Sequence, residues 1–472
     1  MSHSYLLIKD DLRIQNNLAL SSFLDNKEKL KKAIYFYDKK TFETRSAQRW
    51  WLWNSLKTFK NKLKTLEIEL DIVYEDTEDY LNFLIKKKLI SSIYWNKSLN
   101  IPEKNQEIKI KNILIKNDVK IFEYKSNLLN QLEEVKKDDG TPFKVFTPYW
   151  KKAEQSYLKN PFRQQFKEEN KIINSNKVSI DRSLDQILPN KNWFKKFEKY
   201  WDTDENAAHK IIDNFIDEKI DKYATNRDIP GIEGTSRLSP YLAFGQISIH
   251  IVFNKCLELK KKGIGYRRYI NELGWREFSH SLLHNFPSME KENLREDFNN
   301  FAWVKNDKLL KIWKKGNTGY PIVDAGMREL YETGWMHNRV RMISASFLVK
   351  HLRIHWDEGE AYFRDSLLDF NVANNVAGWQ WVAGTGADAA PYFRIFNPII
   401  QGEKFDPEGI YVKRWCPELK KVPKEYIHRP WELSEDNQKK FDAKIGMTYP
   451  SPVVNHEQAR QAALDSFQKL KK

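Results

Sequence analysis

The stretch that decides the fold runs from residue 369 to residue 398 and reads DFNVANNVAGWQWVAGTGADAAPYFRIFNP. Its small residues let a flat ring lie against the backbone, and its Asn and Asp side chains can hold the polar edge of such a ring. Trp379 and Trp381 add large faces for stacking or electron transfer. A tight helix–loop–helix with aromatic packing accounts for the Trp pair but not for the whole string. The stretch therefore indicates a binding site for a flat ring system.

This string resembles the flavin-site signature of the photolyase/cryptochrome family, N-x-x-x-W-Q-W followed by T-G-x-D-A-A-P-Y-F-R-I-F-N-P. The match continues through QGEKFDPEG (401–409) and is longest against bacterial class I photolyases that repair cyclobutane pyrimidine dimers (CPDs). It covers nearly the whole chain, weakly before residue 130 and strongly from residue 219 onward. A run of this length is far more specific than a short motif.

The charge of the chain favours an anionic partner. Lys and Arg number 79 against 64 Asp and Glu, which gives a net charge of +15, and the pI is about 9.3. Nucleic acid is the first candidate for such a chain. The N-terminal third is rich in Lys, Asn and Ile, and a compositional bias of that kind would give the same excess.

Cysteine content and hydropathy exclude several classes of protein. Two cysteines, Cys256 and Cys416, give neither a disulfide framework nor a CxxC metal site. A reducing compartment fits this usage. The start of the chain has no signal-peptide pattern, and no apolar run approaches the ~20 residues of a membrane span. These features predict a cytoplasmic protein, associated with the nucleoid in a bacterium, that binds no membrane.

The first 125 residues are predicted to form an α/β domain with a doubly wound parallel sheet. Short apolar runs alternate with helical patterns such as residues 46–66, as in βαβ units. No GxGxxG follows the first run, so an ordinary dinucleotide site is not supported. The five runs predicted as strands are YLLI (5–8), AIYFY (33–37), LDIVY (70–74), ISSIYW (90–95) and VKIFEY (119–124).

Residues 126–202 are predicted to connect this domain to an all-α domain over residues 203–472. The connector contains DDGTPFKVFTPYWKKA (138–153), whose turn chemistry predicts a loop before a helix. From about residue 203 the apolar spacing is near 3.6, as in 207–224 and 347–356. The tail EQARQAALDSFQKLKK is predicted to be a final helix.

The resemblance implies that the helical domain binds flavin adenine dinucleotide (FAD). TSRLSP (235–240) follows a glycine-containing turn, and hydroxyls with free N–H groups at a helix start can hold a phosphate. Simple helix capping is the alternative for this motif. Arg341 and Asp369 are natural partners for an ion pair beside the flavin, and Asn375 matches the position that faces flavin N5. The predicted FAD-binding residues are Tyr223, Thr235, Ser236, Arg237, Leu238, Ser239, Asn338, Arg341, Asp369, Asn371 and Asn375.

A second set of residues matches positions that hold the lesion. Glu272 and Trp275 lie three apart, hence on one helical face; alone they would suit an ordinary helix with a half-buried Trp. The family's (6-4) enzymes carry His where Asn338 and Met342 stand here, so this chain is expected to act on CPDs. The predicted substrate-binding or DNA-binding residues are Glu272, Trp275, Arg276, Asn338, Arg339, Met342, Trp381, Arg394, Gln401 and Lys404.

The resemblance also implies an electron relay through Trp303, Trp356 and Trp379, although any one Trp is more often a core residue. The predicted catalytic set is therefore Glu272, Asn338, Asn375, Trp303, Trp356 and Trp379. Many relatives carry a second antenna chromophore, methenyltetrahydrofolate or a flavin. YWN (94–96) matches the start of the antenna segment, but Leu99 and Asn100 stand where Tyr-Glu is common, which argues against folate.

Together these features predict a monomeric deoxyribodipyrimidine photo-lyase that repairs CPDs in UV-damaged DNA by electron transfer from photoexcited reduced FAD. A cryptochrome-type blue-light photoreceptor is one alternative; Asn375, Glu272 and Trp275 weigh against it. A (6-4) photolyase is another, and Asn338 and Met342 weigh against that enzyme. A light-independent nucleic-acid-binding protein with a vestigial pocket would bind no FAD.

Overall fold

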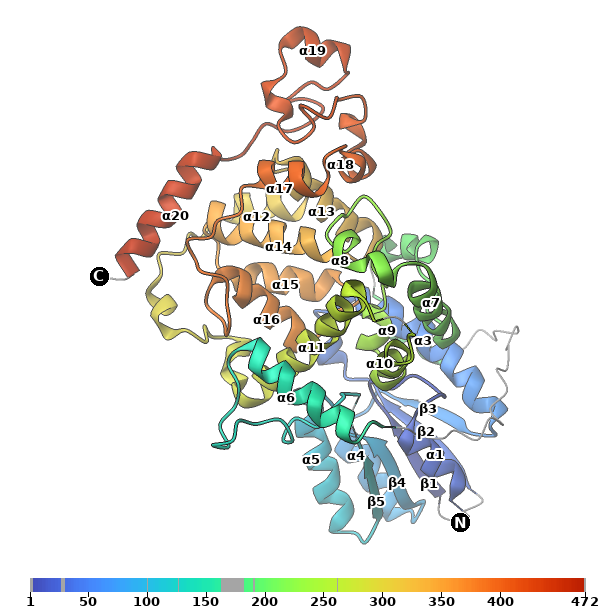
Figure 1. Ribbon diagram of the computed structural model, residues 1–472. Coiled ribbons are helices and arrows are strands. Elements are labelled where there is room, and N and C mark those ends of the chain that lie inside the picture. Colours follow the sequence, from blue (N-terminus) through green and yellow to red (C-terminus); the bar gives the residue numbers. More distant parts are fainter. Residues whose placement is uncertain are drawn as a thin grey trace.

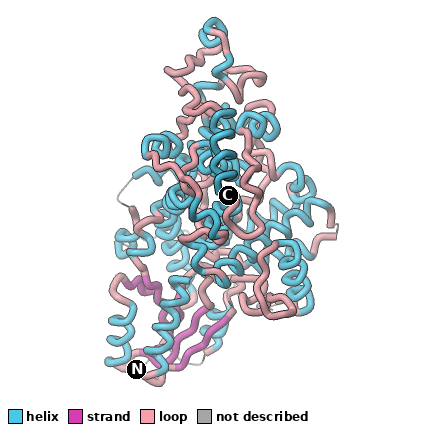
Figure 2. Tube along the Cα trace, turned by 90° about the vertical axis from the view of Figure 1, so that its left-hand side faces the viewer, coloured by secondary structure: helices cyan, strands magenta, loops and turns pink. Residues whose placement is uncertain are grey.

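The computed structural model describes residues 3–26, 30–99, 101–125, 127–162, 182–189, 192–260 and 262–470. A parallel sheet with its helices forms one end of the molecule, and a larger helical body forms the rest (Figure 1). In the side view the strands gather in the same end, and helices make up nearly all of the regular structure elsewhere (Figure 2). The predicted fold class, an α/β domain followed by a helical domain, is confirmed.

The sheet has five parallel strands in the order β3-β2-β1-β4-β5. The chain winds outward from β1 to β3, then returns to β4 and β5, which makes the sheet doubly wound. All five predicted strands are present. The strands are β1 (His3–Ile8), β2 (Lys31–Phe36), β3 (Glu69–Val73), β4 (Ile90–Asn96) and β5 (Lys120–Tyr124). The helices that accompany them are α1 (Leu18–Asp25), α2 (Lys39–Phe42), α3 (Ser46–Thr65), α4 (Thr77–Lys86) and α5 (Ile101–Ile115).

The two faces of the sheet belong to different cores. On β1, Leu6 and Ile8 belong to a large cluster that continues into the helical domain. Tyr5 and Leu7 point to the opposite face, into a smaller cluster that includes residues of α4 and α5. This follows from the alternation of side chains along a strand. One face of the sheet therefore shares its core with the helical domain.

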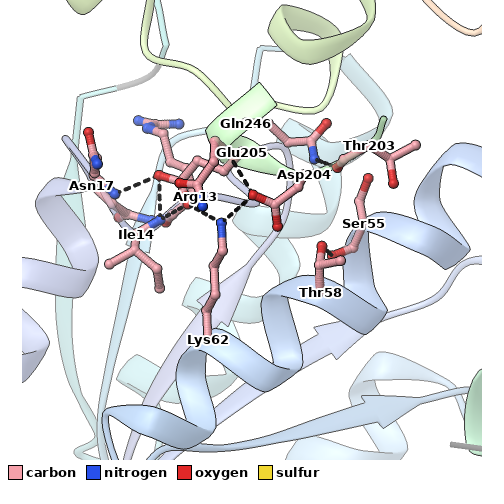
Figure 3. Close-up of polar contacts among 12 residues, drawn as sticks. Arg13, Ile14, Asn17, Ser55, Thr58, Lys62, Thr203, Asp204, Glu205 and Gln246 are labelled. Carbon is pink, nitrogen blue, oxygen red and sulfur yellow. Dashed lines mark hydrogen bonds and ion pairs between the residues drawn. The ribbon is translucent and has the colours of Figure 1, made fainter. Parts of the chain in front are cut away.

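A buried polar joint also ties the two domains together (Figure 3). The Glu205 carboxylate, at the start of α7, accepts hydrogen bonds from the backbone N–H groups of Ile14 (3.0 Å) and Gln15 (2.9 Å). Lys62 of α3 pairs with the carboxylates of Glu205 and its neighbour Asp204. Because Glu205 is almost fully buried, these partners are needed to offset its desolvation.

The connector contains the helix that the sequence predicted after its loop, α6 (Phe146–Lys159). The charge-rich continuation of the connector over residues 163–181 lies outside the described residues. Two short 3-10 helices follow, η1 (Arg182–Ile187) and η2 (Asn192–Lys199). Gly274 of α11 lets α6 approach closely, because a Cβ there would lie 2.4 Å from the Trp150 ring.

The rest of the chain is helical. Its α-helices are α7 (Glu205–Glu218), α8 (Tyr223–Asn226), α9 (Ser239–Ala243), α10 (Ile249–Leu257), α11 (Ile264–Asn285), α12 (Asp307–Lys314), α13 (Pro321–Thr333), α14 (Asn338–Ser346), α15 (Trp356–Ser366), α16 (Val372–Ala383), α17 (Pro398–Phe405), α18 (Ile410–Trp415), α19 (Glu435–Lys440) and α20 (His456–Leu470). Among the described residues, no helix is long and apolar enough to cross a membrane.

Two predicted helices in this region are wrong in detail. Residues 207–224 are not one helix: α7 ends at Glu218, a 3-10 turn follows, and α8 begins at Tyr223. The pattern over 347–356 also predicted one helix. Its first half is instead a π-helical turn, η6 (Phe347–His351), and the chain then leaves the helix, with Arg353 at a φ of 52°, before α15 begins at Trp356. Apolar spacing cannot reveal such a break, because all five residues of the π-helical turn are buried and no exposed face marks the change.

Candidate active site

Helix α14 separates two groups of predicted site residues. Arg339 and Arg341 are two residues apart, so their side chains leave the helix about 200° apart. Arg339 points to Asp228, in the loop after α8, with a 2.8 Å ion pair. Arg341 points to Asp369 instead, with a 2.7 Å ion pair. The helix therefore forms a wall between a predicted lesion side and a predicted cofactor side.

On the cofactor side, the predicted pair between Arg341 and Asp369 is present. The Arg341 Nη2 donates to the Asp369 Oδ2, and the Arg341 Nε donates to the backbone oxygen of Met336. The Asp369 side chain is only 3% exposed, so its charge depends on these contacts. The guanidinium is thus fixed in place at the start of α14.

The TSRLSP segment leads into α9, as predicted. No side chain caps this helix, so the simple capping explanation for the hydroxyls does not hold. The Ser236 Oγ accepts from the Tyr269 hydroxyl (3.3 Å), and the Ser239 Oγ accepts from the Trp335 Nε1 (3.2 Å). Each Ser hydroxyl accepts one bond and can still donate its own proton. That arrangement suits an anionic ligand.

The backbone of this segment is unusual at Arg237. Its φ of 53° lies in the left-handed region that is costly for a residue with a side chain. The Arg237 guanidinium lies over the rings of Trp201 (4.4 Å) and Trp335 (5.0 Å). The preceding Gly234 is required for the turn, because a Cβ there would lie 2.5 Å from the backbone oxygen of Asn226. Strain of this kind is often stored at functional sites.

Helix α16 and its N-cap residue carry two of the three asparagines predicted to contact FAD. The Asn371 side-chain oxygen accepts from the Asn374 N–H (3.1 Å) and so caps the helix. The Asn375 Nδ2 donates to the Glu360 carboxylate (3.0 Å), which fixes the direction of its amide. Burial raises the pKa of Glu360, and the neighbouring Arg364 opposes the rise. Glu360 thus orients Asn375, a role that the sequence pattern did not reveal.

The buried polar atoms around α14 and α16 fit a polar cofactor. Buried donors and acceptors are normally hydrogen-bonded. Within the described residues, several near the predicted cofactor residues have no hydrogen-bond partner from the protein. Among them are the Arg237 Nε, His337 Nε2, Asp369 Oδ1 and Trp379 Nε1 atoms. A ligand with both donors and acceptors, such as FAD, would satisfy groups of this kind.

Tyr223 and Leu238, also predicted at the cofactor, are both buried in the protein. The Tyr223 ring packs edge-on against the rings of Phe215 (5.4 Å) and Tyr269 (5.3 Å). Burial raises the pKa of its hydroxyl, so Tyr223 stays protonated. Tyr269 links Tyr223 to Ser236, which places Tyr223 close behind the hydroxyl segment.

On the lesion side, Glu272 of α11 belongs to a chain of charged groups. It pairs with Arg227, the residue that directly follows α8. The next residue, Asp228, pairs with Arg339 of α14. Burial raises the pKa of Glu272, and the Arg227 charge opposes the rise. The network joins three helices and brings Glu272 and Arg339 to one surface; Arg227 and Asp228 were not singled out in the sequence.

Asn338 and Met342 lie at the same end of α14. Asn338 is exposed, and its Nδ2 lies 3.9 Å from the Met342 sulfur, one turn further along the helix. An amide offers both a donor and an acceptor to a base edge. The thioether is soft and adaptable. The two predicted lesion contacts are thus side by side.

Trp275 and Trp381 are both half-buried, as expected for stacking walls. Trp275 lies one turn after Glu272 on α11. One face of its ring is covered by Phe146, with ring centres 3.9 Å apart and planes 8° apart. Trp381 follows Trp379 by two residues on α16. Their side chains therefore point to different sides of the helix, and Trp379 is the buried one.

The three predicted relay tryptophans occupy neighbouring elements. Trp379 of α16 is buried against α15, where Gly359 leaves room for its ring; a Cβ at Gly359 would lie 2.1 Å from it. Trp356 begins α15, is fully buried, and donates its Nε1 hydrogen to Asn293 (2.8 Å). The His355 ring contacts both Trp356 (5.4 Å between centres) and the half-buried Trp303 (4.9 Å). The contact through His355 was not foreseen.

Most predicted phosphate contacts lie near the lesion side. Arg339 lies over the Phe405 ring (4.4 Å), as does Lys404 (5.3 Å). Gln401 is on the same helix, α17. Arg394 is exposed, and its backbone oxygen accepts a hydrogen bond from the buried Lys350 (2.9 Å).

Arg276 does not join this group. Its side chain is only 11% exposed and pairs with the buried Glu277 at 3.2 Å. Glu277 in turn accepts from the N–H of Leu129 in the connector. The structure therefore places the Arg276 side chain in a joint between α11 and the connector.

A separate cavity of 770 Å³ lies at the carboxyl ends of β1 and β2. Its lining comes from both domains and includes Asp10, Tyr35 and Arg45 from the α/β domain and Phe370 from the helical domain. Burial and nearby carboxylates raise the pKa of Asp10 to about 7. In open α/β sheets this edge is the usual position of a ligand.

The chain matches known proteins along nearly its full length. The family model described as "DNA photolyase" matches residues 4–168, and the one described as "FAD binding domain of DNA photolyase" matches residues 269–469. A deoxyribodipyrimidine photo-lyase from Agrobacterium fabrum is 39% identical over 98% of this chain and 97% of its own length. The chain belongs to the photolyase/cryptochrome family, and its helical domain is an FAD-binding domain.

Solved structures agree with this assignment. A bacterial class III photolyase from Agrobacterium tumefaciens superposes with a TM-score of 0.91 at 37% identity, covering 100% of this chain and 98% of that one. A Synechocystis cryptochrome gives a TM-score of 0.87 at 26% identity, covering 98% and 99%. A photolyase and a cryptochrome thus share the fold of this chain.

Proposed function

We propose that this protein is a deoxyribodipyrimidine photo-lyase that repairs cyclobutane pyrimidine dimers in DNA by light-driven electron transfer from reduced FAD. The observation that carries the proposal is the two-sided wall formed by α14. Arg341 holds Asp369 on the cofactor side, and Arg339 joins the Glu272 network on the lesion side. Similarity to enzymes of that name over the full chain supports the same activity.

The residues of the chain divide the work. When bound, FAD supplies light absorption and the transferable electron, which is chemistry that the protein itself lacks. Ser236 and Ser239 would hold its phosphates, and Asp369 and Asn375 its ring edge. Because Glu360 takes the Asn375 amide hydrogens, the amide oxygen faces away from Glu360 and is the atom that would meet the flavin.

On the other side of α14, Trp275 and Trp381 would stack against a flipped-out dimer. A dimer pairs and stacks poorly, so flipping it out of the duplex costs less than flipping a normal base. When protonated, Glu272 would donate a hydrogen bond to a dimer carbonyl, and its raised pKa favours that form. Arg339, Arg394, Gln401 and Lys404 would bind phosphates, which fixes register without reading sequence.

The cryptochrome alternative rests on the shared fold and on sequence similarity to cryptochromes. The pairing of Glu272 with Arg227 and the contact of Asn338 with Met342 provide base-directed groups that signalling does not need. The class within the family remains a prediction. The sequence motifs suggest class I, whereas the similar Agrobacterium tumefaciens structure is of a class III photolyase.

We also propose that the 770 Å³ cavity at the edge of the sheet holds the antenna chromophore. Tyr35, Tyr37 and Phe42 line it with flat rings, and Arg45, Asp10 and Glu103 add polar groups. This lining suits a flavin-sized aromatic molecule. Extraction and mass analysis of chromophores from purified protein would identify one molecule or two per chain; FAD alone, even after incubation with candidate chromophores, would contradict this proposal.

The decisive test of the repair function uses purified, reduced protein and an oligonucleotide with one thymine dimer. Repair is expected under blue light and not in the dark. No repair by protein that holds its FAD would contradict the proposal and favour a photoreceptor. Repair of a (6-4) lesion in its place would assign the other enzyme class. A protein that never binds FAD would favour a light-independent nucleic-acid-binding protein.

A further inference from the structure

The start of α6 reaches Trp275, one wall of the predicted lesion pocket. Phe146, the first residue of α6, lies face to face with Trp275 at 3.9 Å. Its ring is only 9% exposed, and Phe278 closes the edge of the pair, 5.8 Å from Trp275 and 6.0 Å from Phe146. Phe146 can cover only one face of Trp275, so a stacked base would use the other face.

A second contact fixes Phe146 from the opposite direction. The backbone N–H of Phe146 donates to the Asp388 Oδ2 at 3.0 Å. No side chain of α6 or its preceding residue caps this helix, so Asp388 satisfies an N–H at the helix start and places a negative charge at the positive end of the dipole. Asp388 adopts a left-handed backbone with φ of 48°, an arrangement that Asp tolerates better than most residues.

Asp388 belongs to the segment that carries the other wall of the pocket. It follows Trp381 by seven residues, and the loop between them is closed by a hydrogen bond from the Ala390 N–H to the Trp381 backbone oxygen (3.2 Å). Phe146 therefore touches the Trp275 wall through its ring and the Trp381 segment through its backbone. We propose that Phe146, held by Asp388, positions Trp275 relative to Trp381 so that the gap between the two walls fits a dimer.

This inference rests on the repair function proposed above. It gives the connector, through Phe146, a role in that function. Phe146 is a positioning residue, since it acts through Trp275. An aromatic pair contributes about 0.5–1.5 kcal/mol beyond its buried area. The loss of the flat ring should therefore weaken binding of the dimer by about 3- to 10-fold, while phosphate contacts and binding of undamaged DNA stay the same.

The test compares four variants of the full chain with FAD bound. Phe146→Leu keeps apolar volume but removes the flat ring, and Phe146→Tyr restores it. Asp388→Ala removes the acceptor for the N–H, and Val145→Ala is the control, because Val145 is exposed on the same loop. The affinity for a dimer oligonucleotide and for its undamaged copy is first measured in the dark. The number of dimers repaired per absorbed photon is then measured at saturating DNA.

We expect Phe146→Leu and Asp388→Ala to lose affinity for the dimer alone, with unchanged repair at saturation, and Phe146→Tyr and Val145→Ala to match wild type. Equal or tighter dimer binding by Phe146→Leu would overturn the proposal, since it would make Phe146 neutral or an obstacle. An equal loss of affinity for undamaged DNA would also overturn the proposal. If Phe146→Leu does not retain FAD, the Asp388→Ala result decides alone. Failure of the wild type to repair dimers would instead contradict the function itself.

Discussion

The two sides of α14 differ in how their charged groups are satisfied. On the lesion side, Glu272, Arg227, Asp228 and Arg339 pair with one another at a partly open surface. On the cofactor side, Asp369 is nearly inaccessible and satisfies only one of its oxygens from the described protein. The first side can therefore exchange partners when DNA arrives. The cofactor side depends on a bound ligand to satisfy its remaining buried polar atom.

The largest effect should come from removing the buried carboxylate. In Asp369→Ala the Arg341 charge loses its partner, and breaking a buried ion pair costs about 3–5 kcal/mol. We expect purified protein to lose its yellow colour and all light-dependent activity. Visible absorbance of the purified protein, compared between the variant and wild type, measures this.

Asp369→Asn is the matched control for size. It keeps the shape and one acceptor oxygen, so it should retain part of the FAD. Full FAD content in Asp369→Ala would show that the cofactor side is satisfied without this carboxylate and would remove the contrast between the two sides.

The relay is the next test, because it enters the cofactor side from α15. Trp356→Phe keeps an aromatic ring of similar shape but removes the indole that gives up an electron. We expect light-driven reduction of bound FAD to fall to background, while chemically reduced protein repairs dimers at the normal rate. Unchanged photoreduction, followed by visible spectroscopy, would exclude Trp356 from the relay. Trp313→Phe, at another ring that contacts Trp379, serves as the control.

A smaller effect is expected on the lesion side, from Glu272→Ala. A hydrogen bond to a charged group contributes about 1.5–3 kcal/mol, so repair should fall by roughly tenfold or more. FAD should stay bound, because Glu272 pairs with Arg227 and not with the buried groups behind α14. Loss of FAD in this variant would contradict the separation of the two sides. Glu233→Ala, at an exposed carboxylate near α9, is a suitable control.

The sequence predicted the strands of the sheet better than the contacts between side chains. The five strands follow from apolar runs whose period and length are local properties. The ion pair of Arg341 with Asp369 was also predicted, but only by resemblance. Arg227 and Glu360 were missed, because each acts by pairing with a residue far along the chain.

Arg276 shows the same limit. Arg276 sits one position after Trp275, so its sequence position suggests a DNA contact. Its direction is set by Glu277 and the connector, which no local pattern encodes. The break within 347–356 was missed for a related reason: all five residues of the π-helical turn are buried, so the apolar pattern carries no sign of a change in helix type.

The smallest effect concerns Lys350, which lies in that π-helical turn beneath the loop of Arg394. Burial lowers the pKa of Lys350 from 10.5 to about 7, and the charge of Arg394 adds to the decrease. Between these two values the unfolded chain binds a proton that the folded chain does not. The contribution of Lys350 to stability therefore rises with pH across that window and is smallest below about pH 7.

Replacement by Met removes this titration and also the hydrogen bond to the Arg394 carbonyl, which is worth about 1 kcal/mol. We expect the difference in unfolding free energy between wild type and Lys350→Met, measured with urea, to change in favour of wild type as pH rises from 7 toward 10.5. A difference that stays constant with pH would mean that Lys350 keeps its charge when folded. In that case the charged Lys350 side chain would support the Arg394 loop from below. The charged groups of the lesion side would then extend deeper into the helical domain than its ion pairs indicate.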